Sequence, residues 1–131
     1  MRRRYLLDTH IVLWWLRSDR KLGHQTREMI RKSECSVSVV TLFELLAKSA
    51  TGKLPLPAGS LADQIETFGF RLLPLSAAHV VSGAALNGLH PDPFDCLLLG
   101  VARTERLCLL TRDAQLLDRA VPLLGELILE A

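Results

Sequence analysis

The sequence lacks the short motifs by which several large enzyme classes are identified. It contains neither G-x-x-x-x-G-K-[ST] nor G-x-G-x-x-G, the glycine-rich loops that hold nucleotide phosphates. It also lacks G-x-S-x-G, the turn that carries the nucleophilic serine of α/β-hydrolases. The histidines are scattered, without an H-x-x-x-H pair or the Cys/His cluster of a zinc site: His10, His24, His79 and His90. These absences argue against nucleotide-loop, serine-hydrolase and zinc chemistry.

Paired cysteines and a cleavable leader are missing as well. The three cysteines are odd in number and form no C-x-x-C motif, which predicts reduced, mostly buried thiols in a cytoplasmic protein. The N-terminal arginines resemble the start of a signal peptide. However, Asp8 and His10 interrupt the apolar stretch, no A-x-A-like site follows, and the stretch is too short to cross a bilayer. We therefore expect that the protein does not associate with a membrane.

The composition is typical of one folded domain. The chain has 131 residues, of which 49% are hydrophobic, and this is enough for a substantial core in a single domain spanning 1–131. The formal net charge is only +2. This excludes a heavily basic protein that coats nucleic acid, but it permits a local basic groove.

Short apolar runs alternate with helical patterns along the chain. The runs predict strands at 4–7, 36–39, 71–73, 107–110 and 127–129. Helices are predicted at 10–17, 26–32, from Ser38 or Thr41 to Lys48, and at 61–68, 77–86, 92–104 and 112–119. Strands that are apolar on both faces and alternate with helices indicate an α/β fold with a parallel sheet covered on both sides.

Acidic residues follow the predicted strands or open the next helices. They are Asp8, Glu44, Asp92, Asp95 and Asp113. Each has an ordinary structural explanation when taken alone. Asp8 can cap a helix, and Asp92 and Asp95 can act as cap and capping-box acid around a proline at the first helical position. Glu44 can pair with Lys48 at i,i+4, and Asp113 can stabilise the first turn of a helix. In open parallel sheets, however, ligands bind beyond the carboxyl ends of the strands, where these acids fall.

Glu44 weakens the ordinary explanations, because apolar residues flank it on nearly all sides in "TLFELLAK". A buried carboxylate needs a partner, and several converging carboxylates would raise one another's pKa values. A hard divalent cation such as Mg²⁺ or Mn²⁺ removes this repulsion and pairs naturally with phosphate. It also supports attack of water on a phosphodiester.

Four segments in this order resemble a PIN domain and, more narrowly, VapC-type toxins, the ribonuclease half of bacterial toxin–antitoxin pairs. They are "LLDTHIVLWWL", "SVVTLFELLAKSATGKLPLP", "HPDPFDCLLLGVA" and "LLTRDAQL". The resemblance implies a three-layer α/β/α sandwich with a short, mainly parallel sheet. It also implies Mg²⁺- or Mn²⁺-dependent cleavage of RNA, a homodimer and a cognate antitoxin.

Carried over by position, the family's four acids fall on Asp8, Glu44, Asp95 and Asp113, with Asp92 as an additional acid, either a cap or an outer metal contact. Thr111 matches a hydroxyl often found two places before the last acid. The chain departs from the family at Pro91 and Cys96, where arginine is common, and at Gly100, where a small residue such as alanine is usual. Substrate preference therefore cannot be transferred.

The residues leave two other classes of function open. One is an Mg²⁺-binding phosphoacceptor module of receiver type, although such modules carry paired acids after the first strand and a lysine after the last. The other is a PIN-like binding module without catalysis, against which the complete set of acids argues.

Positive and aromatic residues suggest further contacts. Lys48, Lys53, Arg103, Arg106 and Arg112 are candidates for substrate phosphates, and Arg112 is favoured because it lies between Thr111 and Asp113. In the helix after Asp8, the run Leu13–Leu16 cannot face one core. We therefore expect Trp14 or Trp15 to pack against another chain, as aromatic anchors often do.

Overall fold

The computed structural model describes residues 3–54, 56, 58–124 and 127–131. Its centre is a five-stranded sheet with all neighbouring strands parallel, in the order β3-β2-β1-β4-β5. The strands are β1 (Arg4–Leu7), β2 (Glu34–Ser38), β3 (Arg71–Leu73), β4 (Cys108–Thr111) and β5 (Ile128–Glu130). The strand order reverses between β1 and β4, so the carboxyl ends of these two central strands form the point at which such folds bind ligands.

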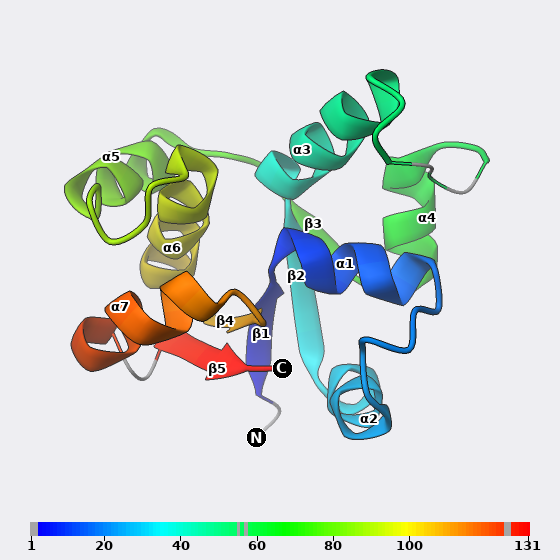
Figure 1. Cartoon of the computed structure of the whole chain (residues 1–131), viewed down its shortest axis with the longest axis horizontal. Helices are drawn as coiled ribbons and strands as arrows, with labels where there is room; N and C mark the ends of the chain where they lie inside the picture. Colours follow the sequence, from blue (N-terminus) through cyan, green and yellow to red (C-terminus); the bar gives the residue numbers. More distant parts are fainter. Residues whose placement is uncertain (1–2, 55, 57, 125–126) are drawn as a thin grey trace.

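Helices cover both faces of the sheet, as predicted (Figure 1). One layer holds α1 (Thr9–Leu16), α2 (His24–Lys32) and α4 (Leu61–Thr67), and the other holds α5 (Ala77–Ala85), α6 (Pro93–Glu105) and α7 (Ala114–Leu124). Helix α3 (Val39–Ala50) stands over the carboxyl end of the sheet. This arrangement is a three-layer α/β/α sandwich.

The side chains of β1 explain why the sequence chooses this arrangement. Tyr5 and Leu7 enter the core beneath α1 and α2, whereas Leu6 enters the core beneath α6, and all three are at most 1% exposed. Successive side chains of a strand point to opposite faces, so a strand that is apolar at every position must be covered on both. Two separate cores follow from this one short run.

Several predicted boundaries are wrong by a few residues for identifiable reasons. The strand predicted at 36–39 is shifted because Ser38 caps α3 by accepting the N–H of Val40, which makes Val39 helical. The helix predicted at 112–119 begins two residues later. Asp113 Oδ1 accepts the N–H groups of Gln115 and Leu116, so Asp113 precedes the helix as its cap.

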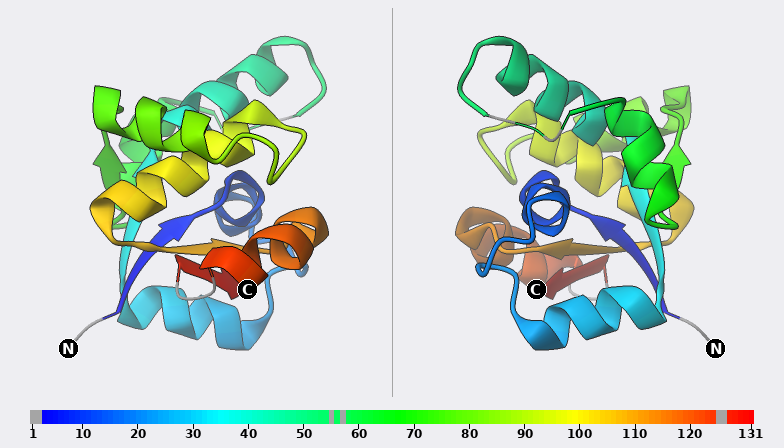
Figure 2. Two further views of the ribbon diagram at one scale, coloured as in Figure 1. Left: turned by 90° about the vertical axis from the view of Figure 1, so that its left-hand side faces the viewer. Right: turned by 90° about the vertical axis from the view of Figure 1, so that its right-hand side faces the viewer.

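Helices α5 and α6 lie side by side and approach very closely (Figure 2). Gly83 and Gly100 form the crossing: a Cβ added at Gly100 would lie 2.4 Å from the backbone nitrogen of Gly83 and 2.6 Å from the carbonyl oxygen of His79. Only hydrogen fits there. The departure at Gly100 therefore has a packing reason.

The cysteines are free, with Cys35 and Cys96 buried and Cys108 partly buried. Within the described part of the chain, no helix combines the length and apolar character that crossing a membrane would require.

Candidate active site

Asp8 is held rigidly between β1 and β4. It is 2% exposed, and its backbone N–H donates to the carbonyl of Leu110. Its Oδ1 accepts the N–H of Thr9, which starts α1, and its Oδ2 accepts the hydroxyl of Thr111 at 2.6 Å. Thr111 in turn accepts the N–H of Asp113 at 3.0 Å. Thr111 thus fixes the two acids that follow neighbouring strands.

Glu44 joins this cluster through α1. The Thr9 hydroxyl donates to Glu44 Oε1 at 2.9 Å and lies 3.1 Å from the hydroxyl of Thr41. The side chain of Glu44 is only 10% exposed. The predicted Glu44–Lys48 pair is also present, at 3.7 Å, but it uses the other carboxylate oxygen and half-exposed Lys48. Glu44 therefore faces the acids rather than open solvent.

The segment before α6 supplies the remaining acids in an unexpected way. Asp92 caps the helix, with Pro93 at its first position, as predicted. Asp95 does not act as a capping-box acid, because the backbone N–H of Asp92 donates to His90 Nδ1 at 2.9 Å. The imidazole takes over that task and leaves the Asp95 carboxyl available for the cluster.

His90 links two of the acids. The ring is 7% exposed; Nε2 lies 3.2 Å from Asp113 Oδ2, and Nδ1 lies 3.2 Å from Asp95 Oδ2. Because Nδ1 accepts from Asp92, we assign the ring proton to Nε2, which donates to Asp113. The contact between Nδ1 and Asp95 then brings two acceptors together unless a further proton lies between them.

The Asp95 carboxyl holds that proton, because its surroundings raise its pKa. Burial, followed by repulsion from Asp8, Asp92, Asp113 and Glu44, raises the pKa of Asp95 to about 8. Burial also raises the pKa values of Asp8 and Glu44, against the hydrogen bonds from Thr111 to Asp8 and from Thr9 to Glu44. Without a cation, the Asp95 carboxyl is therefore protonated at neutral pH.

This geometry fits a hard divalent cation. One potential ligand atom from each of His90, Asp95 and Asp113 lies within 4.8 Å of the others, and because both ring nitrogens of His90 are already hydrogen-bonded, the carboxylates are the ligands left for a cation. Asp8 and Glu44 repel Asp95, and the opposing positive charge is small: half-exposed Lys48 lies 3.7 Å from Glu44, and His10 lowers the pKa of Asp8. Buried carboxylates with so little positive charge are a ligand set for a cation that prefers oxygen.

The raised pKa values predict that the cation-free protein becomes less stable, rather than more stable, as pH rises above the ordinary pKa of a carboxyl group. Between about pH 4 and about pH 8 the cation-free folded protein holds more protons at Asp95 than the unfolded chain does, so the free energy of unfolding falls as pH rises. Asp8 and Glu44 act in the same direction. Thermal unfolding in a chelating buffer should give a lower Tm at about pH 8 than at about pH 6.

In Asp95→Asn this decrease should be smaller, and added Mg²⁺ should raise the wild-type Tm more at the higher pH, where the ligands are deprotonated. A wild-type Tm that rises across this window without metal would contradict the assignment.

Not every predicted residue lies in this cluster. Arg112 is exposed; one of its guanidinium nitrogens donates to the carbonyl of Lys21, and the group lies over the Trp14 ring at 5.9 Å. Trp14 is partly buried. Trp15, the alternative to Trp14 as a contact with another chain, is only 9% exposed and packs against Phe68 and Phe70 within the domain.

Sequence reasoning missed two contributors. His90 has no second histidine at a metal-binding spacing, and Thr9 belongs to no motif that predicts a role in the site. Both act through residues far away in the chain: Thr9 binds Glu44, and His90 contacts Asp113. The nearest sequence signal was the position of His90 immediately before the acids of "HPDPFD".

A family model for the PIN domain matches residues 5–121. The chain belongs to the PIN domain family. No curated protein matches it by sequence. The PIN assignment replaces the alternative of a receiver-type phosphoacceptor module.

Solved structures with the same fold cover nearly all of this PIN domain. A toxin–antitoxin complex from Klebsiella pneumoniae has a TM-score of 0.65 at 18% identity, covering 95% of each chain. VapBC2 from Rickettsia felis, bound to a DNA fragment from their promoter, has a TM-score of 0.66 at 16% identity, covering 97% of this chain and 98% of the other. DNA-bound VapBC from Salmonella typhimurium has a TM-score of 0.66 at 17% identity, covering 99% and 98%. At these identities the likeness concerns the fold.

Proposed function

We propose that this PIN domain, residues 1–131, is a Mg²⁺- or Mn²⁺-dependent endoribonuclease and acts in the cytoplasm as the toxin of a toxin–antitoxin pair. The observation that carries the proposal is the meeting of Asp8, Glu44, Asp95 and Asp113 at the switch point of the sheet, where burial and the neighbouring carboxylates raise the pKa of Asp95 to about 8. The structural neighbours, which are toxin–antitoxin complexes, support the biological setting.

The residues have separate tasks in this proposal. Asp8 and Asp95 are the main ligands of the cation, and Glu44 and Asp113 complete the site or orient the attacking water. Asp92 is a cap whose second oxygen can make an outer contact. Thr111 positions Asp8 and Asp113 through the two hydrogen bonds described above. The cation supplies charge stabilisation at the phosphate and favours deprotonation of water.

Thr9 and His90 would orient the acids. The Thr9 hydroxyl fixes one oxygen of Glu44, and the His90 ring fixes one oxygen of Asp113. Partners of this kind, which hold a ligand in place, commonly change metal affinity or activity by about 10- to 100-fold when removed.

The purified protein should cleave single-stranded RNA internally when Mg²⁺ or Mn²⁺ is present, because the cation is needed to offset the clustered carboxylates. Chelation should abolish cleavage, and readdition of Mn²⁺ should restore it. The measurement is the rate of product formation from an end-labelled RNA. Cleavage that continues unchanged in the chelator would overturn the metal-dependent mechanism, and a failure to cleave any RNA would favour a non-catalytic binding module.

Exposed apolar side chains on α3, α5 and α6 support the proposal that the protein binds partner chains, namely a second copy of itself and an antitoxin. Phe43 is 61% exposed, and its ring lies 6.0 Å from that of Phe94, which follows the capping Asp92. Leu46 on α3 and Val81 on α5 are also exposed. Apolar surface of this kind marks protein–protein contacts. Partly buried Trp14 remains a further candidate contact.

A further inference from the structure

A second charged feature lies at the opposite end of the sheet from the acids. A pocket of about 540 Å³ opens at the amino ends of β1 and β4. Its lining comprises Arg3, Arg4, Tyr5, Arg106, Leu107, Cys108 and Leu127. Arg106, one of the candidates for substrate phosphates, lies in this pocket, two residues before β4 begins. Within the described residues, no acidic side chain lines this pocket.

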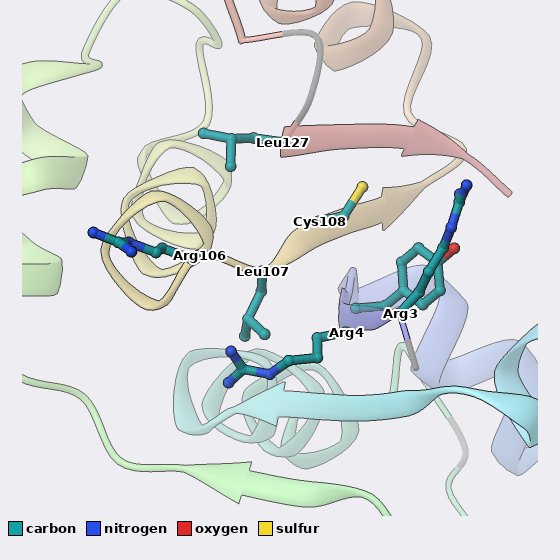
Figure 3. Close-up of a pocket in the computed structure, with 7 residues that line it drawn as sticks. Arg3, Arg4, Arg106, Leu107, Cys108 and Leu127 are labelled. Atoms are coloured by element: carbon teal, nitrogen blue, oxygen red, sulfur yellow. The ribbon is translucent and has the colours of Figure 1, made fainter. Parts of the chain in front are cut away.

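The arginines surround the pocket without converging on one point. Figure 3 shows Arg3, Arg4 and Arg106 on different sides, with Leu107 and Cys108 between them and Leu127 on a further side. All three arginines are exposed. Arg4 has an acidic neighbour, Glu34, at 3.8 Å, but both side chains are about half exposed, so the pair contributes little. The guanidinium groups thus remain available to a ligand with several separated negative charges.

The backbone at Arg106 indicates that an arginine is favoured at this pocket. Arg106 caps α6 in the left-handed conformation, with φ of 55°, where glycine or asparagine is usual, so an arginine is kept at a conformational cost. Tyr5 is the other contribution of β1 to the pocket lining; its buried hydroxyl interacts with Arg3 and raises the pKa of that group, but at 1% exposure the side chain itself offers no polar atom to a ligand.

We propose that this arginine pocket binds backbone phosphates of the RNA substrate at a distance from the scissile bond. The inference rests on the proposed ribonuclease function. Guanidinium groups match phosphate oxygens geometrically, and groups spaced around a rim match successive phosphates better than one small anion. The apolar side chains between them suit the faces of sugars and bases. Because the catalytic acids repel RNA, most of the binding energy has to come from a surface of this kind.

The position of the pocket determines which RNA molecules are long enough to reach both the pocket and the acids. The pocket and the acid cluster lie at opposite ends of β1, which has four residues and is about 13 Å long. An RNA that reaches both must pass around the edge of the sheet. The pocket therefore contributes to the binding of folded or long RNA and leaves the binding of a short oligonucleotide unchanged.

The test compares the double variant Arg4→Gln/Arg106→Gln with the wild type and with Arg17→Gln/Arg20→Gln, which loses the same charge from exposed positions outside the pocket. Binding of a folded RNA and of a short oligonucleotide is measured in chelator over a range of salt concentrations, so that no RNA is cut. The pocket variant should bind the folded RNA roughly tenfold more weakly, with a salt slope lower by about 1 to 2. Its affinity for the oligonucleotide should be unchanged, and the control should match the wild type.

Equal loss in the pocket variant and the control would overturn the site, as would duplex DNA that binds the pocket as tightly as folded RNA. The two proposals fail separately. If the wild type cleaves RNA and the pocket variant binds folded RNA normally, the pocket proposal fails alone. If the pocket variant loses binding but the wild type never cleaves RNA, the nuclease proposal fails alone.

Discussion

Asp95→Asn should reduce metal-dependent RNA cleavage at least about a hundredfold while leaving the fold intact. The fold should remain intact because the pKa of Asp95 is raised to about 8, so the cation-free protein already holds a neutral group there at neutral pH. Asparagine has nearly the same shape and is neutral, so it preserves the packing but cannot offer a carboxylate to a cation. The Tm without metal should be unchanged or higher at about pH 8.

The measurement combines cleavage rates with thermal unfolding in chelator and in Mg²⁺. Asp63→Asn is a matched control, because Asp63 is an exposed acid in the first turn of α4. It should retain wild-type activity and wild-type stabilisation by Mg²⁺. A folded Asp95→Asn protein that cleaves RNA at the wild-type rate would remove Asp95 from the mechanism. Asp8→Asn should be similarly inactive, with an additional loss of stability if the amide turns its N–H₂ group toward the Thr111 hydroxyl.

Gly100→Ala should destabilise the protein by about 3 kcal/mol and lower the Tm by about 10 °C. The added Cβ would meet backbone atoms of α5 at 2.4, 2.6 and 2.7 Å, and backbone cannot move aside as a flexible side chain would. The two helices would have to separate along their whole contact. Thermal or denaturant unfolding of the variant measures the loss.

Two other glycines make this prediction specific. Gly83→Ala brings a Cβ to 2.9 Å from Leu97 Cα and should cost less than Gly100→Ala. Gly23 has a negative φ and no atom within 4 Å of an added Cβ, so Gly23→Ala should cost less than about 1 kcal/mol. The expected order of destabilisation is Gly100, then Gly83, then Gly23. A Gly100→Ala protein as stable as Gly23→Ala would show that the crossing adjusts freely.

The sequence determined the kind of layers by itself, because hydrophobic periodicity is a local property. The run Tyr5–Leu7 is apolar at every position, and this already requires a strand covered on both faces. The same periodicity identified the helices, and Asp92-Pro93 marked the start of α6. Periodicity does not fix a helix boundary where a capping side chain sets the first helical residue, as Ser38 and Asp113 do.

Only the tertiary structure decided how the acids meet and which other residues serve them. Their positions after strands predicted a common edge, but the hydrogen bonds of Thr9 to Glu44 and of Thr111 to Asp8 span 35 and 103 residues of sequence. Pairs so far apart cannot be predicted from a local sequence pattern. The burial of Trp15, the use of His90 in place of a capping-box acid, and the position of Arg106 at the end of the sheet away from the acids depend on the same long-range packing. Periodicity specifies which face of an element is buried, whereas the partner on that face is fixed only when the whole chain has folded.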